Sequence, residues 1–128
     1  MIVLDTHAWI WWATQSRKLP VRMRRRIDRA PTIGVSAISC WEIAMLEAKA
    51  RIRFDRTVLS WIEQALATEK LELLPIDPPV AVLAAQLPHF GGDPADHIIV
   101  ATAKLCSAPL VSADTRIAAS KLVNVLWE

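Results

Sequence analysis

Short apolar runs typical of β-strands alternate with helical patterns along the chain, and this alternation restricts the fold more than any other feature. The expected strands are IVL (2–4), TIGV (32–35), LELL (71–74), PLVSA (109–113) and VNVLW (123–127). Helices are expected at 7–13, from Pro20 onwards, at 38–49, 57–68, 78–87 and 94–105, and briefly before the last strand. Such alternation predicts right-handed crossovers and a mostly parallel sheet. We therefore expect a three-layer α/β/α fold with a central sheet of about five strands.

The size and composition of the chain fit one domain. It has 128 residues, of which 53% are hydrophobic, enough to bury a core without disulfides or a structural metal. No repeat, linker-like segment or membrane-spanning run interrupts it, and residues 1–5 lack the features of a signal peptide. We therefore expect a single cytoplasmic domain over residues 1–128. Cys40 and Cys106 belong to no CxxC pair and are expected to be buried and reduced.

Basic residues are distributed unevenly along the chain. The formal net charge is only +2, yet seven of the fifteen Lys and Arg residues lie between Arg17 and Arg29, in RKLPVRMRRRIDR. Such a segment can contact the phosphates of a nucleic acid, or it can be the solvated face of an ordinary helix. The sequence leaves both interpretations open.

Four acidic residues stand near places where strands end or helices begin. Asp5 follows IVL, Asp114 follows PLVSA, Asp96 lies in GGDPADHIIV and Glu42 lies in SCWEIAML. Each has a structural explanation when taken alone, because Asp is a favoured helix N-cap and Ser39 with Glu42 matches a capping box. Glu42 also falls on the apolar side of its helix, so it is expected to face inward.

The stretch GGDPADHIIV needs more than a capping explanation. Asp93 is expected to cap the helix, with Pro94 in the first helical position. Asp96 is less well explained, because the helix that follows is apolar nearly all round and is therefore expected to be buried. A carboxylate that enters a buried helix needs a partner.

Taken together, the four acids predict a metal site. Parallel strands end at one edge of a sheet, where ligand sites collect, so Asp5, Asp96 and Asp114 are expected to converge there with Glu42 nearby. Crowded carboxylates repel one another, and they either take up protons or hold a cation. We expect no basic partner within this apolar framework, and oxygen-only ligands favour Mg²⁺ or Mn²⁺ over zinc. Because no Ser or Cys nucleophile stands beside a His base, we expect metal-assisted hydrolysis of a phosphodiester.

Four segments of the chain together resemble a known family. MIVLDTHAWIWW, SAISCWEIAML, GGDPADHIIVATA and LVSADTRI occur in this order and cover essentially the whole chain. The set resembles a PIN domain, particularly the VapC-type toxins of VapBC toxin–antitoxin modules. By this resemblance the catalytic acids are Asp5, Glu42, Asp96 and Asp114. Asp5 and Asp96 are the metal ligands that it implies most firmly.

The resemblance also implies an activity and partners. It implies a PIN-like α/β/α domain that acts as a Mg²⁺- or Mn²⁺-dependent endoribonuclease on RNA. It further implies a homodimer, held inactive by a cognate VapB-type antitoxin whose tail enters a groove near the site. His97 stands where related sequences often carry Arg after DPxD, so contacts with substrate there are expected to differ.

Two other functions fit the same fold class. One is a non-catalytic module that binds RNA or protein without cleaving it. The other is a receiver-type phospho-acceptor domain, which needs paired acids after the first strand and a lysine near the last strands. Here Thr6 follows Asp5 and no lysine ends VNVLW, so a receiver is much less favoured.

Overall fold

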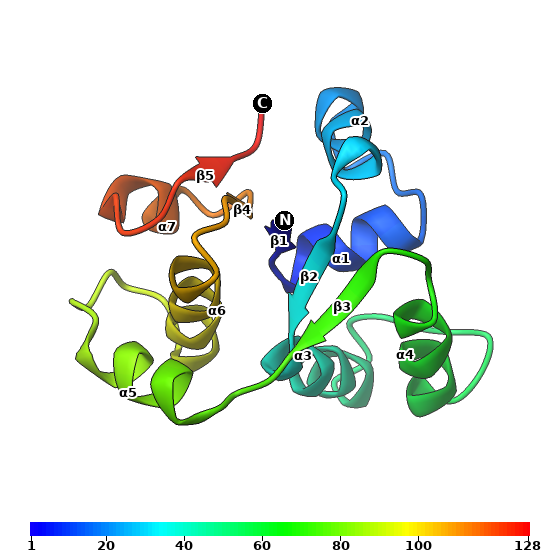
Figure 1. Cartoon of the computed structure of the whole chain (residues 1–128). Coiled ribbons are helices and arrows are strands. Elements are labelled where there is room, and N and C mark those ends of the chain that lie inside the picture. Colours follow the sequence, from blue (N-terminus) through cyan, green and yellow to red (C-terminus); the bar gives the residue numbers. More distant parts are fainter.

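Five parallel strands form one sheet in the order β3-β2-β1-β4-β5 (Figure 1). The computed structural model describes all residues, 1–128. The strands are β1 (Ile2–Leu4), β2 (Ile33–Ser36), β3 (Leu71–Leu74), β4 (Leu110–Val111) and β5 (Val125–Leu126). All five lie where they were expected, although β4 and β5 are shorter because only two residue pairs join them. The predicted parallel sheet is confirmed.

Seven helices connect and cover the strands. They are α1 (Thr6–Ala13), α2 (Val21–Arg29), α3 (Ala37–Ala48), α4 (Val58–Leu66), α5 (Pro78–Gln86), α6 (Pro94–Leu105) and α7 (Thr115–Ser120). Side chains of the preceding residues cap most of them: Thr57 accepts a hydrogen bond from the amide of Ser60, and Asp77 accepts one from that of Val80. These local signals explain why the helices begin close to the expected positions.

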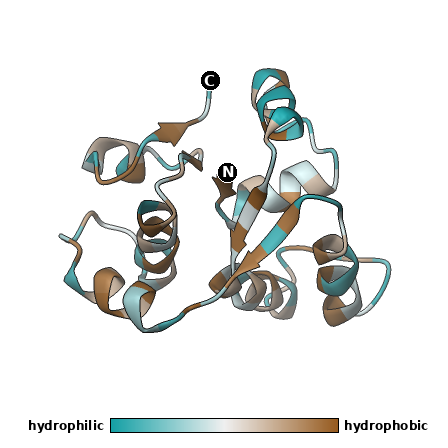
Figure 2. Cartoon of the chain, viewed as in Figure 1, coloured by the Kyte–Doolittle hydropathy of each residue, from teal (hydrophilic) through white to brown (hydrophobic).

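The sheet separates two apolar cores. Ile2 and Leu4 contribute to a core shared with α1 to α4, whereas Val3, between them, contributes to a second core shared with α6 and α7. In Figure 1 the helices α5 to α7 accordingly lie on one side and α1, α2 and α4 on the other. Figure 2 shows that the strands are mainly hydrophobic and that α2 is mainly hydrophilic. The three-layer arrangement matches the expectation.

Helix α2 is attached to the first core by only two of its side chains. Met23 and Ile27 are buried, with 4% and 0% of their surface exposed. Arg24 fixes the helix further by donating to the backbone carbonyls of Trp11 and Trp12 at 3.3 and 3.2 Å. The rest of the helix surface is therefore left for charged side chains.

The structure answers two expectations, one about membrane-spanning helices and one about the two cysteines. No helix is both long and apolar enough to cross a membrane. Both cysteines are free, as expected, and Cys40 is partly buried. Cys106, however, is exposed, so the expectation of burial is wrong for this residue. It follows the last residue of α6, where the helix has passed beyond the core.

Replacement of Ile27 by Ala should lower the free energy of unfolding by about 2 to 5 kcal/mol, because it empties a fully buried site that holds α2 in place. Replacement of Val21, 65% exposed on the same helix, by Ala should change it by less than about 0.5 kcal/mol. Urea denaturation measures both values. Equal losses would contradict the assignment of Ile27 as the anchor.

Candidate active site

All four predicted acids line one pocket at the carboxyl edge of the sheet. The pocket has a volume of about 430 Å³, and we call it the acidic pocket after its five carboxylates: Asp5, Glu42, Asp93, Asp96 and Asp114. The other lining residues are Thr6, His7, Trp11, Ile99, Ala113 and Arg116. Two larger hollows, of about 650 and 570 Å³, lie elsewhere, but they are lined by two and one acidic residues respectively. The chemistry therefore points to the smaller one.

Asp5 stands directly after β1 and serves two purposes. Its Oδ1 accepts a hydrogen bond of 2.9 Å from the amide of Ala8, so Asp5 is the N-cap of α1, one of the two roles expected for it. It also lines the acidic pocket, where burial raises the pKa of its carboxyl group above the ordinary value. The Ser112 hydroxyl and the Ala8 amide partly offset this rise by stabilising the charged form.

Glu42 projects from the second turn of α3. The helix is capped by Ser36, whose hydroxyl accepts from the amide of Ile38 at 3.2 Å. The capping box of Ser39 with Glu42 is therefore wrong: Ser39 lies inside the helix, is buried, and its hydroxyl is 2.9 Å from that of Thr6. The Thr6 hydroxyl in turn donates to Oε1 of Glu42.

The environment of Glu42 makes its carboxyl group weakly acidic. Burial is the main cause, and the negative charges of Asp93, Asp96 and Asp5 add to it, raising the pKa of Glu42 to about 6. The hydrogen bond from Thr6 acts in the opposite direction. A carboxyl group with a pKa near neutrality can exchange a proton under physiological conditions.

Asp93 and Asp96 form a reciprocal capping box at the start of α6. Oδ1 of Asp93 accepts from the amide of Asp96 at 2.9 Å, and Oδ2 of Asp96 accepts from the amide of Asp93 at 3.1 Å. The expectation that Asp93 caps the helix is correct, but Asp96 contributes to the same cap. Burial, followed by the charge of Asp93, raises the pKa of Asp96 to about 6.

The glycines before these aspartates have separate structural reasons. Gly91 has a φ of 88°, a left-handed conformation that few other residues adopt. A Cβ atom at Gly92 would lie 2.7 Å from Oδ2 of Asp96 and 2.9 Å from the ring of Phe90. A side chain at this position would therefore displace the carboxylate that enters the acidic pocket.

Asp114 is paired with a basic residue that the sequence interpretation missed. Arg116 donates from Nη2 to Oδ2 of Asp114 at 3.0 Å and from Nη1 to the Gly91 carbonyl at 2.6 Å. This pairing holds the pKa of Asp114 below its ordinary value. The expectation that no basic residue pairs with these acids is wrong. Asp114 caps α7, and Arg116 lies in the first turn of that short helix. The spacing DTR at a helix start was the available signal.

His97 lies beside the acidic pocket but is not among its lining residues. Its Nδ1 is 3.1 Å from the Asp93 carbonyl, and its ring stacks on Phe90 with a centroid separation of 4.2 Å. The position after Asp96 thus supports the loop before α6.

The donor set of the acidic pocket suits a hard divalent cation, although the side chains are not arranged as a ready-made metal cluster. No group of three or more His, Cys, Asp or Glu residues is close enough to hold an ion as placed. Asp5 and Asp96 each direct an oxygen to a backbone amide, and Asp114 faces Arg116. The facing groups are nevertheless carboxylates and hydroxyls, which favour Mg²⁺ or Mn²⁺. Their mutual repulsion is what a cation would relieve.

Solved structures share this fold. A DNA-bound VapBC from Salmonella typhimurium has a TM-score of 0.71 at 19% identity, over 98% of each chain. VapBC2 from Rickettsia felis, bound to a promoter fragment, has a TM-score of 0.70 at 15% identity, over 100% of each chain. FitAcB from Neisseria gonorrhoeae has a TM-score of 0.65 at 25% identity, over 98% of this chain and 96% of that one.

The sequence itself decides the family. The PIN domain family matches residues 2–121. This chain belongs to the PIN domain family. It is also 38% identical over 117 residues to Ribonuclease VapC22 of Mycobacterium tuberculosis, covering 91% of this chain and 88% of that relative. The resemblance to PIN domains of the VapC type is therefore confirmed.

The raised pKa values predict an unusual dependence of stability on pH. Glu42 and Asp96 titrate at about 6 in the folded protein, above their ordinary values of 4.5 and 3.8, so the unfolded chain loses these protons first as the pH rises. Their contribution to stability is thus largest in acid and is lost as the pH rises towards about 6. In EDTA, the Tm of the wild type minus that of a Glu42→Gln/Asp96→Asn variant should decrease as the pH rises from about 4.5 to about 6.5.

Mg²⁺ or Mn²⁺ should reverse this loss. Thermal unfolding with the ion should raise the Tm of the wild type at pH 7 more than at pH 5, because only ionised carboxylates bind the cation well. The double variant should respond little at either pH. If the Tm of the wild type minus that of the double variant stays constant or rises with pH in EDTA, the raised pKa values of Glu42 and Asp96 are contradicted.

Proposed function

We propose that this protein is a Mg²⁺- or Mn²⁺-dependent endoribonuclease that acts as the toxin of a toxin–antitoxin module. The observation that carries the proposal is the acidic pocket, at the carboxyl edge of a parallel sheet in a PIN domain. The relative that shares 38% of its sequence is named a ribonuclease, and the structural neighbours are toxin–antitoxin complexes. RNA is accordingly the substrate we assign.

In this proposal Asp5 and Asp96 hold the cation. When bound, the ion supplies positive charge that makes a water more acidic and offsets charge on the attacked phosphate. Asp114 completes the pocket, directly or through water, while Arg116 fixes its orientation. The Arg116 guanidinium is exposed beside this carboxylate, where it can also contact an incoming phosphate.

Glu42 is the residue we assign to the proton of the attacking water. Its Oε1 is occupied by the Thr6 hydroxyl, which leaves Oε2 to orient the water and accept the proton. The pKa of about 6 keeps most of the group ionised at neutral pH while allowing it to take up a proton. Thr6 and Ser39, both buried, hold the carboxylate in place.

Partners belong to the same proposal. We place a cognate VapB-type antitoxin on this chain because the structural neighbours include VapBC complexes. We also assign a homodimer, as the similarity to VapC-type toxins implies. Residues 1–128 act as a single domain in the cytoplasm.

Asp96→Asn should reduce metal-dependent RNA cleavage at least about 100-fold, because an amide ligates a divalent cation poorly. Asp93→Asn should stay within about threefold of the wild type, since Asn caps a helix as well as Asp does. Cleavage of total RNA by antitoxin-free protein, with Mn²⁺ and with EDTA, measures both. Circular dichroism of each variant reports whether the fold is kept.

The same experiment separates the proposed enzyme from a non-catalytic binding module. An antitoxin-free protein that binds RNA in Mn²⁺ without cutting it would favour the binding module. Equal cleavage by the wild type and a folded Asp96→Asn variant would refute the assigned site. Equal losses in the Asp93 and Asp96 variants would show that the roles of the two aspartates were divided wrongly.

A further inference from the structure

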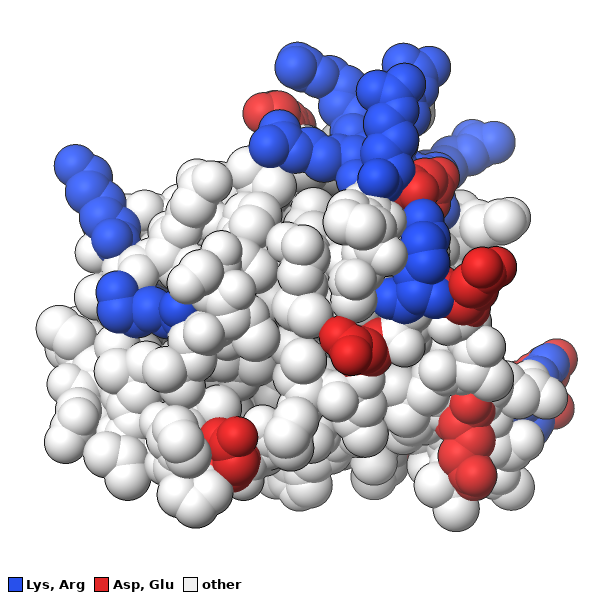
Figure 3. All heavy atoms as spheres, viewed as in Figure 1, with Lys and Arg blue, Asp and Glu red and all other residues white.

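Four arginines of α2 share one face of the helix. Arg22, Arg25, Arg26 and Arg29 are spaced by three, one and three residues, which places them on one side of an α-helix. We call this set the arginine face. Met23 and Ile27, which are buried in the core, occupy a different side. Figure 3 shows a cluster of Lys and Arg side chains projecting from the part of the surface where Figure 1 places α2.

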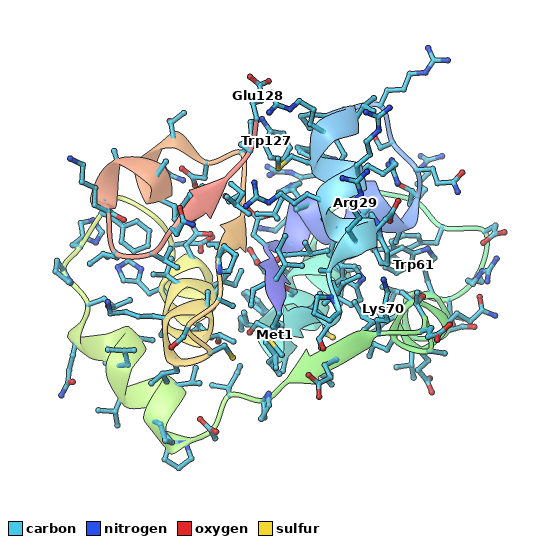
Figure 4. The ribbon with its side chains drawn as sticks, turned by 45° about the horizontal axis from the view of Figure 1, so that its top comes forward. Met1, Arg29, Trp61, Lys70, Trp127 and Glu128 are labelled. Atoms are coloured by element: carbon cyan, nitrogen blue, oxygen red, sulfur yellow. The ribbon has the colours of Figure 1, made fainter.

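The arginine face borders a hollow of about 570 Å³ at the amino edge of the sheet. Met1, Pro31 and Pro109 line the same hollow, and they precede β1, β2 and β4 in the chain. In Figure 4 Arg29 lies on α2 and Glu128 at the C-terminal end beyond β5, while Met1 lies lower, near β3. Asp5 and Asp114, by contrast, follow β1 and β4. The arginine face and the acidic pocket therefore lie towards opposite edges of the sheet.

The charges of the arginine face are not neutralised within the protein. The ion pairs of the structure are Arg56 with Asp55 and Arg116 with Asp114, and neither includes α2. Asp28, the one acid on α2, instead accepts a hydrogen bond of 2.9 Å from the indole of Trp12. Glu128 is the one acidic residue that lines the hollow. The unpaired positive charges of this surface would therefore attract a ligand with several negative charges.

Helix stability does not explain this arrangement. Arg22 lies in the first turn, where a positive charge opposes the helix dipole, and no acid occupies that turn. Like charges three and four residues apart repel, and the arginine face contains four such pairs: 22–25, 22–26, 25–29 and 26–29. Arg26 and Arg29, in the last turn, favour the dipole, but Arg22 and Arg25 gain nothing from it. A binding role accounts for their placement better than folding does.

We propose that the arginine face binds the phosphate backbone of RNA, away from the point of cleavage. Guanidinium groups bind phosphates through paired hydrogen bonds. The seven helical steps from Arg22 to Arg29 span about 10 Å, room for two or three phosphates. The choice of RNA rests on the proposed function. The two sites then act on one molecule, which must be long or folded enough to reach both edges of the sheet.

The test compares two variants that each lose two exposed, unpaired arginines. Arg22→Gln/Arg25→Gln removes half of the arginine face, whereas Arg51→Gln/Arg53→Gln removes the same charge from the connection between α3 and α4. The probe is a fluorescein-labelled 30-nucleotide poly(U) RNA, with binding measured by anisotropy in EDTA so that no cleavage occurs. The salt concentration is varied from about 50 to about 200 mM, because affinity that depends on phosphate contacts falls steeply over this range.

The arginine-face variant should bind the RNA about tenfold more weakly at the lowest salt, and its slope of log K against log salt should fall by about 1.4 for two lost contacts. The matched control should change affinity by less than about twofold. The arginine-face variant should also keep or raise its Tm, because it loses repulsion and an unfavourable dipole interaction. A structural role would instead lower the Tm together with the affinity.

Three outcomes would overturn the inference. Equal weakening in both variants would show a general charge effect, and unchanged binding would show that the face does not meet RNA. Displacement of the RNA by poly-glutamate as efficient as that by unlabelled poly(U) would make an acidic protein segment the better occupant. Failure of the nuclease itself is distinct, because a protein that binds poly(U) through the arginine face but never cleaves RNA refutes only the proposed function.

Discussion

The rest of the structure depends on the burial of β1 from both sides. This strand has only three residues, all buried, and it is the middle strand of the sheet. Ile2 and Leu4 enter one core and Val3 enters the other, so a shift of one residue would exchange the two cores. The register of β1 therefore fixes where Asp5 emerges, and with it the position around which the acidic pocket is built.

Capping and chemistry are combined in the acidic pocket. Asp5, Asp93 and Asp114 each cap a helix, so the amino ends of α1, α6 and α7 all approach the same pocket. The positive ends of the helix dipoles lower the cost of placing several carboxylates together. Burial and mutual repulsion still raise the pKa values of Glu42 and Asp96, which leaves the pocket short of positive charge. Residues that look like ordinary caps thus also form the site.

The sequence was sufficient to predict the strands, the helices and the convergence of the four acids on one pocket, because these depend on local periodicity and on the shared edge of a parallel sheet. It was not sufficient where a choice depended on packing. Ser39 was expected to start the helix, but its hydroxyl contacts that of Thr6, 33 residues away, and Ser36 caps the helix instead. The pairing of Arg116 with Asp114 could have been inferred from the local spacing DTR, but the hydrogen bond of Arg116 to the Gly91 carbonyl joins residues 25 positions apart. No local pattern encodes such a contact.

The close approach at Gly92 shows that a residue without functional groups can help to shape the candidate active site. The space that a methyl group would need there is already taken by the Asp96 carboxylate and the Phe90 ring. A change at this position would act on the chemistry indirectly, by moving an acid that remains present in the sequence. In a mutational scan scored by activity, Gly92 would thus resemble a catalytic residue, whereas a list of reactive side chains would omit it.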